Sequence, residues 1–328
     1  MKPHRYHGFD FLRGLCAIGI ALHHLLFWHG IGDLHNIGTY GVYVFFIISG
    51  ASMTVAYADK MQEIPYWAFI ARRYARLAPL YWLVLFSRNP FGQHANDLLL
   101  NMSMFFGFAN PNLTSMVATG WSLGIEFVFY FTFPLFLALS ASRWRWYWFF
   151  LAFIMQITFV HGLIHTHDDF LIKRGEFGQF IAFIAYFLAG CIIGRSINCN
   201  WHLSAPLTWV VFSGLLGILI ITCAYTDYPV LGNSIGMAIA IGCMALVFIA
   251  GKLKFTSKIA WIANQCGLMS YGVYLLHARL FAWLFPFLVI LPNYMSVTVV
   301  IMLTIFLALL IEKYFERPIK EWGYKSIS

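Results

Sequence analysis

Residues 9–28 read FDFLRGLCAIGIALHHLLFW, an apolar stretch long enough to cross a bilayer that nevertheless carries Arg13 and His24. Ten residues separate the two, which on a helix is three turns, or about 16 Å of rise. Ionisable side chains are costly in hydrocarbon, so those inside a membrane span are functional candidates by default. The stretch therefore predicts a transmembrane helix with two candidate functional residues.

The composition is that of a protein that crosses the membrane several times. Of its 328 residues, 61% are hydrophobic and only 10% are charged, whereas soluble domains carry about 25% charged residues. We expect a single membrane domain over residues 1–328 without an appended soluble domain. We also expect no removable signal peptide, because no small-residue cleavage site follows the first apolar stretch.

Ten apolar runs approach the length of about 20 residues that a transmembrane helix needs. They are 9–28, 37–57, 70–87, 118–139, 146–162, 177–194, 206–225, 230–250, 264–290 and 295–315. A further run, 98–108, is too short to span and is interpreted as re-entrant or interfacial. The six cysteines are scattered and form no C-x-x-C pair, which favours buried packing positions. The predicted fold class is an all-α, polytopic transmembrane helical bundle.

The distribution of Lys and Arg orients these helices. Seventeen of the 21 basic residues fall on one side of the membrane if the N-terminus is cytoplasmic, and the sides alternate correctly at every loop. Both termini are therefore predicted to be cytoplasmic. Topology also explains the net charge of +8, so we expect no nucleic-acid partner.

A histidine and a carboxylate are predicted at similar depth in different helices. His24 falls in the outer third of the membrane, and Glu126, the only carboxylate far inside a predicted span, lies about 12 Å from the outer face. Such a pair can serve as general acid and base, or can form a structural hydrogen bond between helices. His23 points about 100° away from His24, so only one of the two can face this site, and the sequence does not say which.

Arg73 and Arg76 lie three residues apart on one helix face, on the same side of the membrane as Arg13. Guanidinium groups bind phosphate in a bidentate manner, so these three arginines are candidates to bind a phosphate-bearing ligand. The alternative is a basic helix margin at the lipid headgroups.

Small and polar residues inside other spans are further candidates to line the site. The stretches 41–50 and 120–126 contain glycines that allow close helix approach, and a late span places a histidine in mid-membrane. These candidates are His23, Ser49, Trp121, Ser122, Tyr271, His277 and Arg279. The string of His161, His165, His167 and Asp168 has loose spacing, so we interpret it as a solvated loop and expect no metal site.

Several motifs recur in a fixed order along nearly the whole chain. They are Asp10-x-x-Arg13-Gly14 with His24, Phe45-Phe46-x-x-Ser49-Gly50, Arg73-x-x-Arg76 with Pro79-x-Tyr81, Trp121-Ser122-Leu123-x-x-Glu126, Ser270-Tyr271-x-x-Tyr274-Leu275-x-His277, and Glu316-x-Pro318 beyond the last helix. In this order the chain resembles the acyltransferase-3 family of integral membrane acyltransferases. Family members often have an aspartate where this chain has Tyr43, which departs from the pattern.

The resemblance implies transfer of an acyl group, most often acetyl from cytoplasmic acetyl-CoA, to a hydroxyl of a cell-surface or lipid-linked glycan at the bacterial cytoplasmic (inner) membrane. It implies activity-linked roles for Arg13 and His24, and it matches Arg73, Arg76 and Glu126 to family motif positions. The partners would be acetyl-CoA, the glycan and membrane lipids, with no permanently bound cofactor. His24 would act as a base assisted by Glu126, or would carry the acyl group covalently. A transporter or flippase that uses buried His and Glu is the main alternative, and a scaffold is the third.

Overall fold

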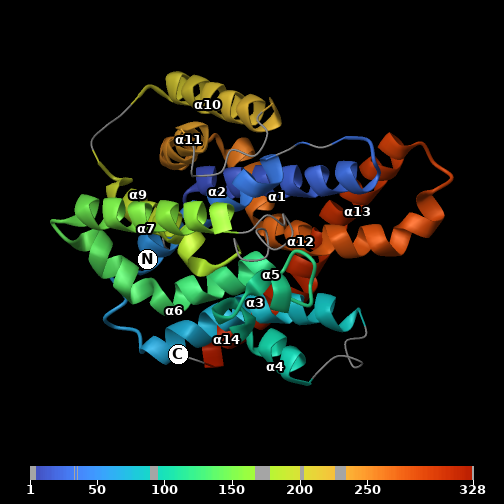
Figure 1. Ribbon diagram of the computed structural model, residues 1–328, viewed down its shortest axis with the longest axis horizontal. Coiled ribbons are helices and arrows are strands. Elements are labelled where there is room, and N and C mark those ends of the chain that lie inside the picture. The colour runs from blue at the N-terminus through green and yellow to red at the C-terminus, as the bar shows by residue number, and fades with distance from the viewer. Residues whose placement is uncertain are drawn as a thin grey trace. The chain divides into compact units, whose positions relative to one another are not determined.

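The computed structural model describes residues 5–32, 34, 36–88, 95–166, 178–199, 203–225 and 234–326. Within these ranges the secondary structure is entirely helical, without a β-strand (Figure 1). Each of the ten apolar runs predicted to span the membrane contains a helix within the residues that the structure describes. The all-α fold class is thus confirmed.

Seven helices in the described part of the chain are long and apolar enough to cross a membrane. They are α1 (His7–Trp28), α2 (Ile37–Tyr57), α6 (Trp121–Ala141), α10 (Ala205–Tyr225), α11 (Ser234–Lys252), α12 (Ser257–Leu288) and the continuous helix Asn293–Gly323, which begins as α13 (Asn293–Ile311). The helix that runs from Phe180 to Ser196 is apolar but shorter. This is a multi-pass membrane protein, while the count of ten crossings and the cytoplasmic termini stay predictions.

The chain divides into two compact units, and the first comprises residues 1–56 and 186–309. It contains α1, α2, α10 to α13 and most of α9 (Ile184–Ser196). Its best-packed pair is α1 and α12, which lie side by side (Figure 1). The two helices run parallel, because residues early in α1 meet residues early in α12 and late residues meet late ones.

Glycine explains how closely α1 approaches α12. A Cβ atom on Gly14 would lie 2.5 Å from the Cβ atom of Cys266, and one on Gly267 would lie 2.5 Å from Oδ1 of Asp10. Both distances are far below van der Waals contact, so only glycine fits at this crossing. In membranes, where no hydrophobic effect drives helices together, small residues of this kind allow the close packing that holds a helix pair.

The second unit comprises residues 57–185 and 310–328. Its elements are α3 (Tyr66–Phe86), α4 (Ala95–Ser103), η2 (Phe105–Phe108), α5 (Pro111–Thr114), α6, α7 (Arg145–Thr166), η3 (Phe180–Phe183), η4 (Glu312–Glu316) and α14 (Arg317–Ser326). The short run at 98–108 forms α4 and η2. Gly107 of η2 packs on Gly124 of α6, where a Cβ atom on Gly107 would lie 2.0 Å from the Gly124 carbonyl oxygen.

The end of the last long helix differs from the prediction. Glu316-x-Pro318 was expected beyond that helix, which is wrong, because α13 continues through one π-helical turn, η4, into α14. In this turn the Arg317 amide donates to the carbonyl oxygen of Glu312, five residues earlier. Pro318 has no amide hydrogen, and the wider turn lets the helix continue past a residue that would otherwise end it.

The expectation of buried cysteines holds for three of the six, while Cys16 and Cys266 are half-buried. All six cysteines are free, and Cys191, Cys223 and Cys243 are buried. Cys199 is exposed, so the prediction is wrong for it. It follows the end of α9, where the helix gives way to a turn and the packing of the apolar run ends.

Candidate functional site

The first unit contains the Arg13 end of the predicted site. Oδ1 of Asp10 lies 3.9 Å from Nη1 of Arg13, and Arg13 Nη2 donates a hydrogen bond of 3.3 Å to the Ser52 hydroxyl of α2. Oδ2 of the same carboxylate accepts a 2.5 Å hydrogen bond from Arg5. The Asp10-x-x-Arg13-Gly14 motif therefore has a local explanation. Asp10 positions the guanidinium one turn away, and Gly14 brings α1 against α12.

The same unit brings His24 together with His277, a residue that the sequence proposed only as a lining candidate. Nδ1 of His24 lies 2.9 Å from Nε2 of His277 on α12, within hydrogen-bond distance. The two rings are nearly parallel, and the Trp28 indole stacks against both. His277 is completely buried, whereas His24 is partly exposed.

His23 and His24 face different neighbours, a choice that the sequence left open. The His23 ring packs against the start of α2, where a Cβ atom on Gly38 would lie 2.5 Å from its Cδ2 atom. His24 instead faces α12 and His277. The 100° between successive helical residues produces this division, and it makes His24 the histidine with a second imidazole as its partner.

The remaining candidates of this unit lie on α2 and α12. Arg279 extends over the Trp283 ring, 4.7 Å from its centroid. Ser49 of α2 is buried, and Tyr271 of α12 is half-buried. Tyr43 stacks on Tyr186 and is packed as an aromatic core residue.

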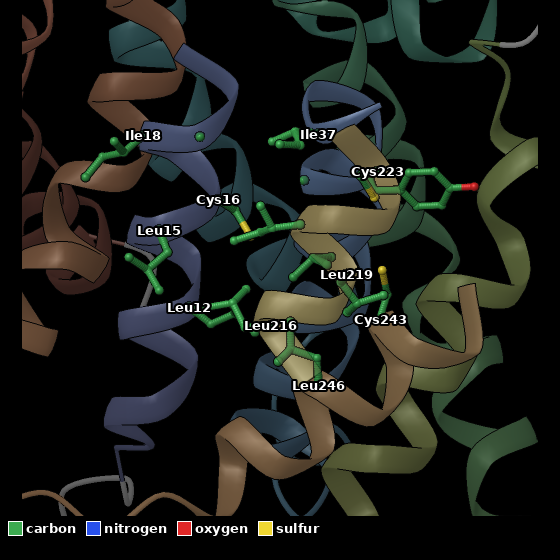
Figure 2. A pocket seen from close by; sticks show the side chains of 15 residues that line it. Leu12, Leu15, Cys16, Ile18, Ile37, Leu216, Leu219, Cys223, Cys243 and Leu246 are labelled. Carbon is green, nitrogen blue, oxygen red and sulfur yellow. The ribbon is translucent and has the colours of Figure 1, made fainter. Parts of the chain in front are cut away.

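The first unit also contains a partly open apolar pocket of about 260 Å³ between α1, α2, α10 and α11 (Figure 2). Its lining consists mainly of aliphatic side chains, together with Tyr40 and three cysteines, Cys16, Cys223 and Cys243. None of its lining residues is a histidine, arginine or carboxylate. This pocket therefore offers no cationic side chain that could bind phosphate.

The second unit contains Glu126 and the two arginines of the R-x-x-R motif. Glu126 accepts a short hydrogen bond from the hydroxyl of Tyr130, one turn further along α6. The Arg73 guanidinium lies over three aromatic rings, with its Cζ 4.6 Å from the centroid of Tyr57, 5.7 Å from Phe69 and 5.5 Å from Tyr130. Tyr130 thus contacts both a predicted catalytic carboxylate and a predicted donor-binding arginine.

Arg73 and Arg76 have different surroundings despite their shared motif. Arg73 is only 6% exposed, and no carboxylate pairs with it among the described residues. Its Nε is buried without a hydrogen-bond partner in that part of the chain. Arg76 is exposed and interacts electrostatically with Glu316, a 2% exposed carboxylate that also accepts a 2.6 Å hydrogen bond from Lys320.

Trp121 and Ser122 open α6, close to the loop that precedes it. Trp121 packs against Phe183, and Ser122 is buried. The nearby Tyr81 of Pro79-x-Tyr81 donates a 2.5 Å hydrogen bond to the side chain of Asn101, which is completely buried and also bonds the backbone at Asp97, Thr114 and Met116. These motif residues hold the α4–α6 connection in place.

Sequence reasoning missed Tyr130 and Asn101. The contact of Tyr130 with Glu126 could have been predicted from the sequence, because residues four apart lie on the same helix face. The only sequence feature that marked Asn101 was its polar side chain within an apolar run. His24 and Glu126 belong to different units, as do Arg13 and Arg73, so their predicted cooperation stays a prediction.

The metal-like string of histidines falls partly outside the described residues. His161 and His165 belong to the last turns of α7, whereas His167 and Asp168 lie beyond the described range. Within the described ranges no group of three potential ligands could hold a metal ion.

Comparison with known proteins places these motifs in a family. A family model described as an acyltransferase domain, acyltransferase-3, matches residues 6–313. A curated protein of Bacillus subtilis (strain 168), named "Putative peptidoglycan O-acetyltransferase YrhL", is 25% identical over 380 aligned residues. The alignment covers 100% of this chain, which spans only 57% of that relative. No solved structure matches the chain. With a match over nearly its entire length, the chain belongs to the acyltransferase-3 family.

Proposed function

We propose that the protein transfers an acetyl group from cytoplasmic acetyl-CoA to a hydroxyl of a cell-surface or lipid-linked glycan. Family membership supports acyl transfer, and the name of the Bacillus subtilis relative supports an O-acetyl product on a glycan. The structural observation that carries the proposal is the His24 imidazole, held inside a membrane-spanning helix by a hydrogen bond to a second histidine. A histidine in such a position is suited to general-base catalysis.

Arg73 supports the donor side of the proposal. A buried guanidinium normally has a carboxylate partner, because an unpaired charge away from water is costly. Arg73 has aromatic contacts instead, so its guanidinium is a candidate to bind an anion that arrives with a ligand. The phosphates of CoA are anions of this kind, and the exposed Arg76 offers a second guanidinium one turn away.

In the proposed reaction, His24 acts first as a base and then as an acid during transfer of the acetyl group. Nε2 of His24 takes the proton of the acceptor hydroxyl while the oxygen attacks the thioester carbonyl. The new C–O bond forms, the C–S bond breaks, and His24 returns the proton to the departing CoA thiolate. Free CoA and the O-acetylated glycan leave, and His24 is neutral again. Glu126 is proposed to assist the base, and Arg13 to bind donor phosphate.

The test uses the purified protein in lipid nanodiscs with radiolabelled acetyl-CoA and glycan acceptors extracted from bacterial envelopes. We expect label in the glycan with the wild-type protein and none with His24→Ala or His24→Gln. His29→Ala, which changes a half-buried histidine just beyond the end of α1, serves as the matched control and should retain transfer. Transfer by correctly inserted His24→Ala and His24→Gln proteins would refute the assignment of the base.

The peptidoglycan sugar chain is the first acceptor to test, because the Bacillus subtilis relative is named as a peptidoglycan O-acetyltransferase. Lipopolysaccharide and lipid-linked oligosaccharide extracts complete the set. Reconstitution in liposomes distinguishes the transporter alternative, which predicts movement of a glycolipid or solute without any covalent acetylation.

The proposed membrane is the bacterial cytoplasmic membrane, with both termini in the cytoplasm. A fluorescent protein fused after Ser328 should fold and fluoresce there, whereas an alkaline phosphatase fusion at the same point should be inactive. The opposite pair of signals would overturn the predicted orientation.

A further inference from the structure

The hydrogen bonds around His277 define which nitrogen of each imidazole carries a proton. Nδ1 of His277 lies 3.0 Å from the carbonyl oxygen of Val273, one turn earlier on α12. A carbonyl oxygen can only accept a hydrogen bond, so Nδ1 of His277 must carry a hydrogen and donate it.

His277 is also neutral in this setting. It is completely buried within a predicted membrane span, and no carboxylate contacts it among the described residues. An imidazolium there would be a buried charge without a counter-ion. A neutral ring with its hydrogen on Nδ1 carries a lone pair on Nε2, so Nε2 of His277 is an acceptor.

The acceptor at His277 then determines the state of His24. Because Nε2 of His277 lies 2.9 Å from Nδ1 of His24 and has no hydrogen to give, Nδ1 of His24 must be the donor. A neutral His24 with its hydrogen on Nδ1 holds its lone pair on Nε2, which is the basic form of that nitrogen.

We propose that His277 is a positioning residue that fixes His24 in the tautomer whose Nε2 acts as the base. The inference rests on the proposed function for its catalytic meaning, but the tautomer itself is independent of it. His277 takes the orienting place that a carboxylate holds in a catalytic triad, here with a neutral acceptor suited to an apolar interior. When His24 gains the proton of the acceptor hydroxyl, its Nδ1–H bond to His277 becomes charge-assisted and stronger. His277 itself neither gains nor loses a proton.

The contact also limits the motion of the His24 ring. The nearly parallel stack of Trp28, His24 and His277 restrains the ring about its side-chain bonds. A single hydrogen-bond direction and a stacked plane together leave one orientation for Nε2. Such preorganisation is what a general base requires, because proton transfer needs hydrogen-bond distance and alignment.

The test separates the hydrogen bond from packing with two variants. His277→Phe keeps an aromatic ring in the stack but removes the acceptor, and His277→Gln returns an acceptor oxygen at that position. His29→Phe is the matched control, since His29 packs on Phe281 and Phe285 of the same helix α12. All variants are prepared in nanodiscs with ¹⁵N-labelled histidine, and the His24 signals are assigned from their loss in His24→Gln.

The first readout is the ¹⁵N spectrum of His24, in which protonated and unprotonated ring nitrogens have distinct shifts. We expect protonated Nδ1 and unprotonated Nε2 in the wild type and in His277→Gln, and a mixture of tautomers in His277→Phe. The second readout is acetyl transfer, where His277→Phe should lower kcat by about 100-fold, leave KM for acetyl-CoA unchanged, and be largely rescued in His277→Gln.

An unchanged His24 spectrum in His277→Phe would overturn the proposal, as would a loss of kcat that is equal in the Phe and Gln variants. A similar loss in His29→Phe would show that general packing on α12 is responsible. If the wild-type protein transfers no acetyl group to any acceptor, the proposed function fails, while the spectrum still decides the tautomer.

Discussion

The histidine of α1 and the first arginine of the R-x-x-R motif are both ionisable groups inside apolar surroundings, but they are accommodated in opposite ways. The His24 ring has a second histidine as its hydrogen-bonding partner, and this contact defines the orientation of the ring. Arg73 has only aromatic faces around a permanent cation, with no carboxylate among the described residues. This difference fits the roles proposed for the two residues, in which His24 exchanges a proton and Arg73 binds an anion.

The largest effect is expected from His24→Ala. Loss of the base should reduce acetyl transfer by about 1,000-fold or more, while KM for acetyl-CoA should change little because the arginines proposed to bind the donor are left intact. Steady-state kinetics in nanodiscs measures both constants. A rise in KM with kcat preserved would mean that His24 binds the donor. It would then contradict the proposal that His24 is the base and Arg73 the donor-binding residue.

The second effect concerns the charge of Arg73. Arg73→Met keeps much of the apolar stem but removes the cation, and should raise KM for acetyl-CoA by about 10- to 100-fold, as for the loss of one charge-assisted contact. The KM of Arg73→Lys for acetyl-CoA should lie between those of the wild type and Arg73→Met. Arg143 is an exposed arginine in the turn before α7, so Arg143→Met is the control and should bind donor normally. Donor affinity that is equal in Arg73→Met and wild type would remove Arg73 from the binding site.

A smaller effect is expected from the link between Glu126 and Arg73. Tyr130→Phe keeps the ring beside Arg73 and removes the hydroxyl that donates to Glu126. One lost hydrogen bond of about 1 kcal/mol should lower kcat by roughly 5-fold. Tyr66→Phe removes a hydroxyl bonded to the Phe131 carbonyl in the same unit and should leave kcat unchanged. Equal losses in the two variants would indicate a structural role for Tyr130.

The smallest effect is on stability. Gly14→Ala introduces a methyl group at a place where Cys266 leaves no room, so α1 must move from α12 at a cost of about 1–3 kcal/mol. Thermal unfolding in detergent should show a lower Tm. Gly214→Ala in α10, where no atom lies within 4 Å of the new methyl, should leave Tm unchanged or slightly raised.

The same Gly14→Ala variant also tests whether the His24–His277 hydrogen bond depends on the packing of α1 against α12. It should disturb the His24–His277 hydrogen bond, which depends on the α1–α12 contact, and should therefore lower kcat. An unchanged kcat with a normal His24 spectrum would contradict this expectation.

Much of the fold follows from the sequence because apolar length and helix formation are local properties. Every predicted span contains a helix, since a lipid-exposed backbone must satisfy its hydrogen bonds within its own segment. The boundaries follow less well. The helix predicted to start at 264 begins at Ser257, and the one predicted to end at 315 continues to Ser326. Packing partners and a π-helical turn determine these ends, and neither can be read from hydropathy.

The features of the candidate site also divide into those that the sequence determines and those that depend on packing. The sequence by itself determined which ionisable residues enter the membrane helices, because their cost in hydrocarbon makes them visible against an apolar background. It could not determine that His24 rather than His23 faces α12, that His277 accepts its hydrogen bond, or that Tyr130 touches both Glu126 and Arg73. Those contacts join residues as far as 253 positions apart, and only the tertiary structure decides them, because a hydrogen bond depends on distance and direction in space.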